Sequence, residues 1–170
     1  MYHPIVIGQF SKMLGNLVNI LDKAAEHANA KKFDMEVLLQ ARLSPDQFTL
    51  MRQIQVACDT AKLAAARLAD KEKDAPEQAD TEVTLAQAKA RIQSIIDYLQ
   101  TFKAADFDDA AGRRITQPRW KGKSLSGEEF LIQHAMPNLY FHVTTAYAIV
   151  RHNGVAVGKM DFLGVLPFNE

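Results

Sequence analysis

The hydrophobic positions of the chain recur at steps of three and four residues in four long stretches, which polar segments separate. Side chains at this spacing share one face of an α-helix. The stretches span residues 4–30, 45–69, 82–103 and 126–154. The pattern therefore predicts an all-α chain in which four long helices each bury one apolar face in a common core.

The fourth stretch has the clearest end signals. Ser126 followed by Glu129 is typical of a capping box at a helix start. Asn153-Gly154 indicates a helix end, because both residues tolerate a left-handed backbone. Pro137 lies inside the stretch and removes one backbone hydrogen bond, so we expect a kink or a local break at that point.

The second and third stretches also begin with capping signals. The sequence Ser44-Pro45-Asp46-Gln47 combines a serine cap, a proline at the first helical position and a glutamine three residues after the serine. It predicts a helix that begins at Pro45. The start of the third helix leaves three alternatives open, which are Asp80, Thr81, and Thr84 with Gln87 three residues later.

The connecting segments differ in character. Residues 31–43 predict a short helical turn over one end of the bundle. Residues 104–125 lack helical periodicity: within them 114–116 and 123–125 fit a short hairpin, and the alternative is a long loop that covers one end of the bundle, with Trp120 as its apolar anchor. The apolar segment after the fourth helix is expected to pack on the bundle or on a second subunit.

Composition narrows the class of protein. The chain of 170 residues suits one domain spanning 1–170, and its 20 basic and 20 acidic side chains give no field that favours nucleic acid or an anionic membrane. We find no secretory signal pattern and no apolar run of the ~20 residues that a membrane helix needs. The single cysteine, Cys58, fits a small core residue in a reducing compartment. A cytoplasmic protein is expected, without nucleic-acid or membrane partners.

Candidate chemistry gathers on one face of the fourth helix, which is apolar at both ends and polar in the middle: Phe130, His134, Asn138, His142, Thr145 and Ile149. Asn138 and His142 are four residues apart and point to the same side. With Asp59 from the second helix they make an N/O site for a divalent ion conceivable. The alternative is a satisfied network in which both bond to Asp59, Lys62 or Tyr147.

Asp59 has two possible roles. It either orients His142 and fixes its tautomer, or it forms an ordinary helix ion pair with Lys62, three residues later. Arg151, near the end of the fourth helix, either compensates the helix dipole or lines the same pocket. The chain has no Gly-rich phosphate loop, no GxSxG elbow and no HExxH motif.

Three segments resemble an uncharacterised bacterial family within the DinB/YfiT-like helical-bundle superfamily: PNLYFHVTTAYAIVRHNGVAVGK, QVACDTAKLAAARLA and MYHPIVIGQFSKMLGNL. The resemblance implies an up-down-down-up four-helix bundle, often dimeric. Members of the superfamily commonly bind a divalent metal through a histidine on helix two and an HxxxH pair on the last long helix, and some are thiol-dependent transferases or isomerases. By position, Asp59, Asn138 and His142 occupy these sites. Only His142 keeps the residue type, so the set suits a harder or weaker site than zinc or nickel prefers.

Two functional hypotheses follow. The first is a small-molecule pocket at the polar centre of the bundle, with zinc, nickel or no metal, in which His142 acts as metal ligand or general base. Its lining would be Asp59, Lys62, Asn138, His142, Tyr147 and Arg151. The second is a non-catalytic homodimeric bundle that has lost the metal site and acts by binding a ligand or a partner. The sequence assigns no reaction, and it leaves open whether the protein is an enzyme.

Overall fold

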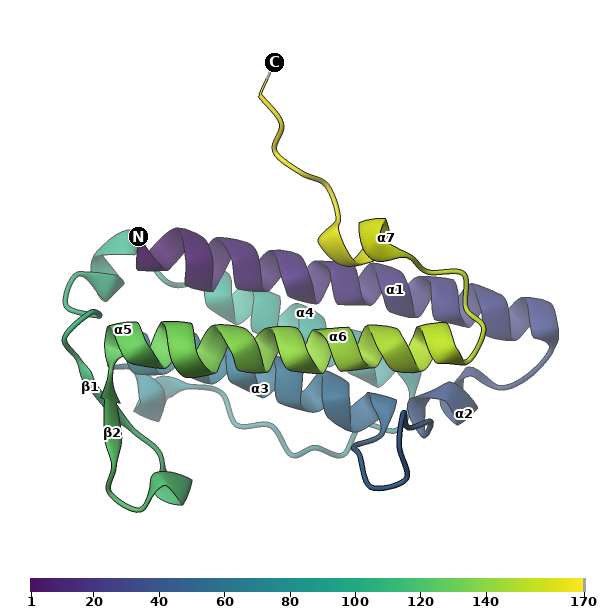
Figure 1. Ribbon diagram of the computed structural model, residues 1–170, viewed down its shortest axis with the longest axis horizontal. Helices are drawn as coiled ribbons and strands as arrows, with labels where there is room; N and C mark the ends of the chain where they lie inside the picture. The colour runs from purple at the N-terminus through teal and green to yellow at the C-terminus, as the bar shows by residue number, and fades with distance from the viewer. Residues whose placement is uncertain (170) are drawn as a thin grey trace.

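The computed structural model describes residues 1–169 and is mostly helical, with one small sheet (Figure 1). The long helices are α1 (Phe10–Lys31), α3 (Leu50–Leu68), α4 (Leu85–Gln100) and α6 (Met136–His152). The short ones are α2 (Met35–Leu39), α5 (Gly127–Phe130) and α7 (Lys159–Leu163). The π-helical turns are η1 (Pro4–Gln9) and η5 (Leu131–Ala135), and the 3₁₀ turns are η2 (Glu72–Asp74), η3 (Ala104–Phe107) and η4 (Pro118–Trp120). The strands are β1 (Arg114–Thr116) and β2 (Ser124–Ser126).

The four long helices pack around one apolar core. Helix α3 packs against both α4 and α6, and α1 packs against the same two helices from the other side. In Figure 1, α1 and α6 run in one direction while α3 and α4 run in the opposite one. Helix α3 has four completely buried alanines, which are Ala57, Ala61, Ala64 and Ala65. Because these side chains are small, the neighbouring helices can approach α3 closely. None of the helices in residues 1–169 combines the length and apolarity that crossing a bilayer requires.

Helix α3 begins five residues later than the sequence predicted. Residues 44–47 form a turn in which Gln47 N–H donates to Ser44 O at 3.0 Å, and the Ser44 hydroxyl donates to Asp46. These residues form a turn rather than the first turn of a helix, so Ser44 does not cap α3. Thr49 does so instead, accepting from Arg52 N–H at 3.2 Å. The predicted start at Pro45 was therefore wrong.

Two capping boxes indicated by the sequence are present. Thr84 and Gln87 form the capping box of α4, which selects one of the three alternatives. Ser126 and Glu129 form the capping box of α5. The break expected at Pro137 is the π-helical turn η5, which ends two residues before that proline. Because Pro137 has no N–H, the turn before it lacks one of the regular α-helical hydrogen bonds.

The hairpin within residues 104–125 is also present, with Ile115 paired to Leu125 and Arg114 to Ser126. It leads directly into α5 through Gly127. A Cβ atom on this glycine would lie 1.8 Å from Ala110 O, so only glycine fits where the two backbone segments meet. This close approach, with the Glu128 N–H donating to Ala111 O at 3.1 Å, holds the start of α5 against the segment that precedes the hairpin.

The apolar segment after α6 packs on the helices over only part of its length. Val155 and Val157 are buried, and α7 packs on α1, where Asn16 Nδ2 donates to Phe162 O at 2.9 Å. Beyond α7 the chain leaves the helices (Figure 1), and Val165 and Phe168 are 89% and 84% exposed.

Candidate functional site

A cleft of about 330 Å³ lies between α3 and the chain that runs from the hairpin into α6. We call it the α3–α6 cleft. Helix α3 contributes Val56, Asp59, Thr60, Leu63, Ala64 and Arg67. The hairpin contributes Gln117, Pro118 and Arg119, and the α5–η5–α6 segment contributes Phe130, His134, Ala135 and Asn138.

The residues meet in the cleft because of their spacing on the two walls. Phe130, His134 and Asn138 are four residues apart, so they line one face of the α5–η5–α6 segment. This is the face whose polar middle the sequence singled out. The hairpin is held against that face by Trp120, whose ring packs edge-on against Phe130 and His134 with centroids 6.3 and 5.3 Å apart.

His134 is neutral and its tautomer is fixed. Arg119 Nη2 lies 3.0 Å from His134 Nε2, and because a guanidinium only donates, Nε2 accepts and the proton is on Nδ1. Burial lowers the pKa of His134, and the positive charges of Arg119 and Arg67 lower it further. The imidazole also stacks on Phe130, with ring centroids 5.4 Å apart.

Two polar atoms of the cleft residues are buried without a partner. Within residues 1–169, neither His134 Nδ1 nor Gln117 Nε2 makes a hydrogen bond, and the Gln117 side chain belongs to a residue that is only 7% exposed. A buried polar group without a partner costs about 1–3 kcal/mol. Both residues line the cleft, so a water molecule, an ion or a ligand bound there would explain these unpaired atoms.

The charges of the cleft are unevenly compensated. Arg67 Nε and Nη2 donate to Glu72 at 2.9 and 2.8 Å. Asp59 lies between two cations, with Oδ1 3.1 Å from Arg91 Nη2 and 3.0 Å from Lys62 Nζ. Arg119 is exposed, and within the described chain its side chain bonds to His134 rather than to a carboxylate. The hairpin end of the cleft is therefore positive.

The predicted trio of Asp59, Asn138 and His142 is only partly brought together. Asp59 and Asn138 both line the cleft, where Asn138 Nδ2 donates to Thr60 Oγ1 at 2.9 Å. His142 is not among the lining residues, and its Nδ1 donates to Gln53 Oε1 at 2.7 Å. Asp59 therefore does not orient His142, since Gln53 does so and the carboxylate is held by cations.

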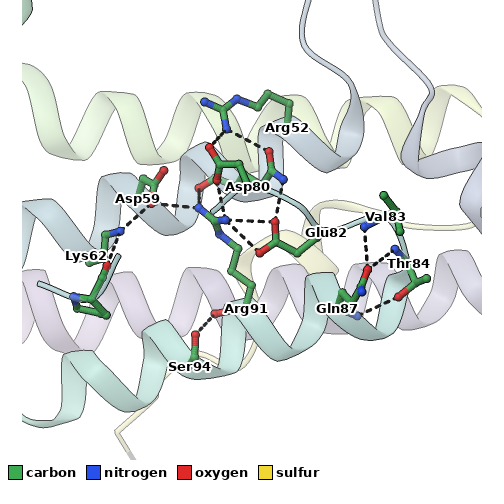
Figure 2. A network of polar contacts seen from close by, with 12 residues as sticks. Arg52, Asp59, Lys62, Asp80, Glu82, Val83, Thr84, Gln87, Arg91 and Ser94 are labelled. Carbon is green, nitrogen blue, oxygen red and sulfur yellow. Dashed lines mark hydrogen bonds and ion pairs between the residues drawn. The ribbon is translucent and has the colours of Figure 1, made fainter. Parts of the chain in front are cut away.

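Asp59 and Lys62 belong to a network of ion pairs that joins α3, α4 and the connection before α4, which Figure 2 shows. Its centre is Arg91 of α4, with a side chain only 1% exposed, which forms ion pairs with Asp59, Asp80 at 2.7 Å and Glu82 at 3.1 Å. Lys62 pairs with Asp59 and donates to Pro76 O at 3.0 Å. The alternative of an ordinary Asp59–Lys62 ion pair is thus present, and the network fastens the connection before α4 onto α3.

The remaining two predicted pocket residues lie elsewhere. Tyr147 packs against Phe162 of α7, with its hydroxyl 3.5 Å from Val157 O. Arg151 is exposed and donates to Val155 O at 3.5 Å. Neither side chain lines the α3–α6 cleft, because both positions lie more than two helical turns beyond Asn138, next to the segment that leads to α7.

The residues carried over from the superfamily do not fit a divalent centre as they are arranged. No group of three or more His, Cys, Asp or Glu side chains within residues 1–169 is placed to hold one ion. The Asp59 charge is already balanced by Arg91 and Lys62, and His142 stands apart beside Gln53. Zinc or nickel binding stays a prediction that this geometry does not favour.

Sequence reasoning missed Arg67, Gln117 and Arg119 as site residues. The signal for the last two was the polar sequence around Pro118, next to Trp120, in a segment for which the sequence left open a hairpin or a loop over one end of the bundle. Arg67 gave no signal, because an arginine in the last turn of a helix is ordinary.

Comparison with known proteins identifies relatives of the whole chain. The family model for a domain of unknown function, DUF1993, matches residues 1–163. A crystal structure of a DinB family member protein from Shewanella denitrificans is 55% identical in sequence and superposes with a TM-score of 0.98; the match covers 100% of this chain and 96% of that one. A search of curated proteins found no match.

Proposed function

The chain belongs to the DUF1993 family, a DinB-like family of unknown function, and on that premise we propose that it binds a small molecule in the α3–α6 cleft. We propose further that it is an up-down-down-up four-helix bundle. The directions of α1, α3, α4 and α6 and the packing of α3 and α1 against the same two helices support that topology.

One observation carries the binding proposal. Two residues that line the cleft, Gln117 and His134, each have a buried side-chain nitrogen without a partner within residues 1–169. The rest of the wall is largely apolar, with Val56, Leu63 and Phe130 prominent. A concave apolar surface with a few convergent polar groups is the usual form of a small-molecule site.

The single tryptophan provides the test. Trp120 contacts His134, so a compound in the cleft should change its fluorescence. We would screen a fragment collection of neutral, cationic and anionic compounds, and we expect at least one to bind saturably and to shift Trp120 emission. Val56→Phe should fill the cleft and abolish that binding, whereas Val37→Phe, at an exposed position outside it, should not. Failure of every class to bind would overturn the proposal.

Metal binding is a separate part of the proposal. The sequence-based set of Asp59, Asn138 and His142 would hold zinc or nickel only after Asp59 left Arg91 and Lys62. Elemental analysis of purified protein, with the melting temperature measured in added zinc and nickel, decides the question. Without bound metal and without a shift in melting temperature, the metal site and any thiol-transferase-like chemistry that depends on it fail.

The second candidate is a homodimer that acts by binding rather than by catalysis. The observation that favours it is the exposure of Val165 and Phe168 in the segment that leaves the helices (Figure 1). Two large apolar side chains on a projecting segment are expected to be covered by another surface. A second copy of the chain is the partner we propose. The cytoplasmic location also stays a prediction.

A further inference from the structure

We infer that the ligand of the α3–α6 cleft is a small organic carboxylate with an apolar body, bound through Arg119 with Gln117 and His134 as further donors. The inference rests on the proposed function, because it names the class of compound that the same cleft takes. Three features of the cleft lead to it: its charge, the kind of hydrogen-bonding groups that lack partners, and its apolar wall.

The charge of the cleft favours an anion. Arg119 bonds to a neutral imidazole rather than to a carboxylate, so its positive charge is uncompensated within the described chain. Arg67 lines the same end and is paired with Glu72, but only through Nε and Nη2. The one acid of the cleft, Asp59, is balanced by Arg91 and Lys62. An entering carboxylate therefore meets positive charge that lacks a counter-ion.

The groups without partners are donors. Because Arg119 donates to His134 Nε2, the free Nδ1 of that ring has the proton and can only donate. The free atom of Gln117 is its amide nitrogen, also a donor. An ionised carboxylate only accepts, through two oxygens that suit a planar guanidinium and further N–H groups. Both atoms have almost no accessible surface, so a carboxylate in the cleft reaches them once the side chains of His134 and Gln117 turn towards it. An ammonium group has no acceptor for these donors, and a neutral amide has one accepting oxygen where a carboxylate has two.

The apolar wall indicates that the ligand is more than an inorganic anion. Val56, Leu63 and Phe130 face a cleft of about 330 Å³, which is at the small end of the range for ligand pockets. Inorganic phosphate would use the charge and leave this surface in contact with water. An aromatic or short aliphatic body attached to the carboxylate would cover it.

The test uses four probes of matched size or charge with the full-length protein. Benzoate, benzamide, benzylamine and inorganic phosphate are titrated while Trp120 fluorescence and the NMR pKa of His134 are followed. We expect benzoate to bind at least tenfold more tightly than the other three. We also expect benzoate to raise the pKa of His134, because its charge opposes that of Arg119 and Arg67. Arg119→Gln should remove the preference for benzoate over benzamide, whereas Arg114→Gln, at a hairpin arginine outside the cleft, should keep it.

Each outcome decides a different point. Equal binding of benzoate and benzamide, or a preference for benzylamine, contradicts the inference that the ligand is a carboxylate. It does not contradict the proposal that the cleft binds a small molecule. Tighter binding of phosphate than of benzoate overturns the apolar body. If Arg119→Gln fails to fold, Gln117→Leu is measured instead, and unchanged benzoate affinity in it also counts against the inference. If neither these probes nor the fragment collection bind, the proposed function and the inference fall together.

Discussion

Arg91 is the residue whose surroundings depart most from an ordinary helix position. Its side chain is 1% exposed and meets three carboxylates, those of Asp59, Asp80 and Glu82. A guanidinium without partners would be very costly at this depth. The network therefore needs both Arg91 and its carboxylate partners. It fixes the connection that precedes α4 (Figure 2).

Replacing Arg91 should cost stability. Arg91→Met keeps much of the side-chain volume but leaves three carboxylates without their shared cation. We expect the free energy of unfolding to fall by roughly 2–3 kcal/mol, somewhat below the loss for a fully buried pair because the carboxylates are partly exposed. Urea unfolding measures it. Arg52→Met is the matched control, since Arg52 is 38% exposed and contacts Asp80 alone among these acids, and it should cost under about 1 kcal/mol. Equal losses would contradict the central role of Arg91.

The same network should make stability depend on pH. Burial alone would raise the pKa of Asp80 and of Glu82, but hydrogen bonds and the charge of Arg91 outweigh it, with Arg52 contributing at Asp80, so both pKa values are lowered. A carboxyl whose pKa is lower in the folded state than in the unfolded state stabilises the fold fully above the unfolded value of about 4. That stabilisation is lost as the pH falls through the lower folded value.

We therefore expect the free energy of unfolding of the wild-type protein to decline between about pH 5 and pH 3, and that of Arg91→Met to decline less. Denaturant titrations at a series of pH values, compared between the two proteins, isolate the contribution of Arg91 from that of other acids. Parallel curves would show that Arg91 does not hold these carboxylates ionised.

At the residue scale, the sequence predicted the position of the site more accurately than the residues that form it. It indicated the polar middle of the last long helix, and His134 and Asn138 do line the cleft. It left two roles open for Asp59, orientation of His142 or an ion pair with Lys62; the second is present, and the sequence did not indicate the further pair with Arg91. Spacing shows which side chains share a face of one helix, but the partner across an interface depends on the rotation and sliding of two helices, which spacing does not contain.

At the scale of elements, the junction between the hairpin and α5 determines the shape of the cleft. Gly127 is buried, and a Cβ atom there would lie 1.8 Å from Ala110 O. Because the obstacle is backbone rather than a movable side chain, a substitution must displace one of the two segments. The hairpin carries Gln117 and Arg119, so such a displacement would also open the cleft.

Gly127→Ala is accordingly expected to lower the free energy of unfolding by roughly 2 kcal/mol or more and to shift Trp120 emission towards that of a water-exposed indole. Thermal unfolding and fluorescence spectra measure the two effects. Gly112→Ala lies in the same segment at a position where a Cβ meets nothing within 4 Å, and it should leave both unchanged. A stable Gly127→Ala protein with native emission would show that the junction is not rigid.

Two helix starts were predicted correctly from their capping boxes. Thr84 with Gln87 and Ser126 with Glu129 satisfy helix donors reciprocally, and their signals were read from the sequence. Ser44 gave an equally good signal, but its hydroxyl bonds to Asp46, and Thr49 caps α3 instead. The bond to Asp46 does not by itself exclude capping, since the Ser126 hydroxyl donates to the Glu129 side chain and also accepts from Glu129 N–H. The tertiary position of the chain decides where the helix begins.

At the scale of the whole molecule, the helical order and the hairpin were foreseen, but the long-range contacts that build the site were not. Arg119 meets His134 because the hairpin folds back onto α5, and Trp120 fills the space between them. A segment without periodicity has no pattern that states where its tip will lie. Such placement is set by packing at the end of the helices, which local sequence does not encode.

The exposed segment after α7 gives the prediction that belongs to this scale. Val165 and Phe168 are 89% and 84% exposed, and burying such a side chain contributes about 1.5–3 kcal/mol. If a second copy covers them, Val165→Asp or Phe168→Asp should weaken self-association at least tenfold, as measured by analytical ultracentrifugation over a range of concentrations. Val37→Asp and Val83→Asp are matched controls, since both valines are exposed elsewhere at 63% and 60%, and they should leave association unchanged. An interface that buries large apolar side chains cannot accept a charge there without cost. A wild-type protein that stays monomeric at high concentration, or a dimer insensitive to both substitutions, would therefore mean that this segment does not join two copies.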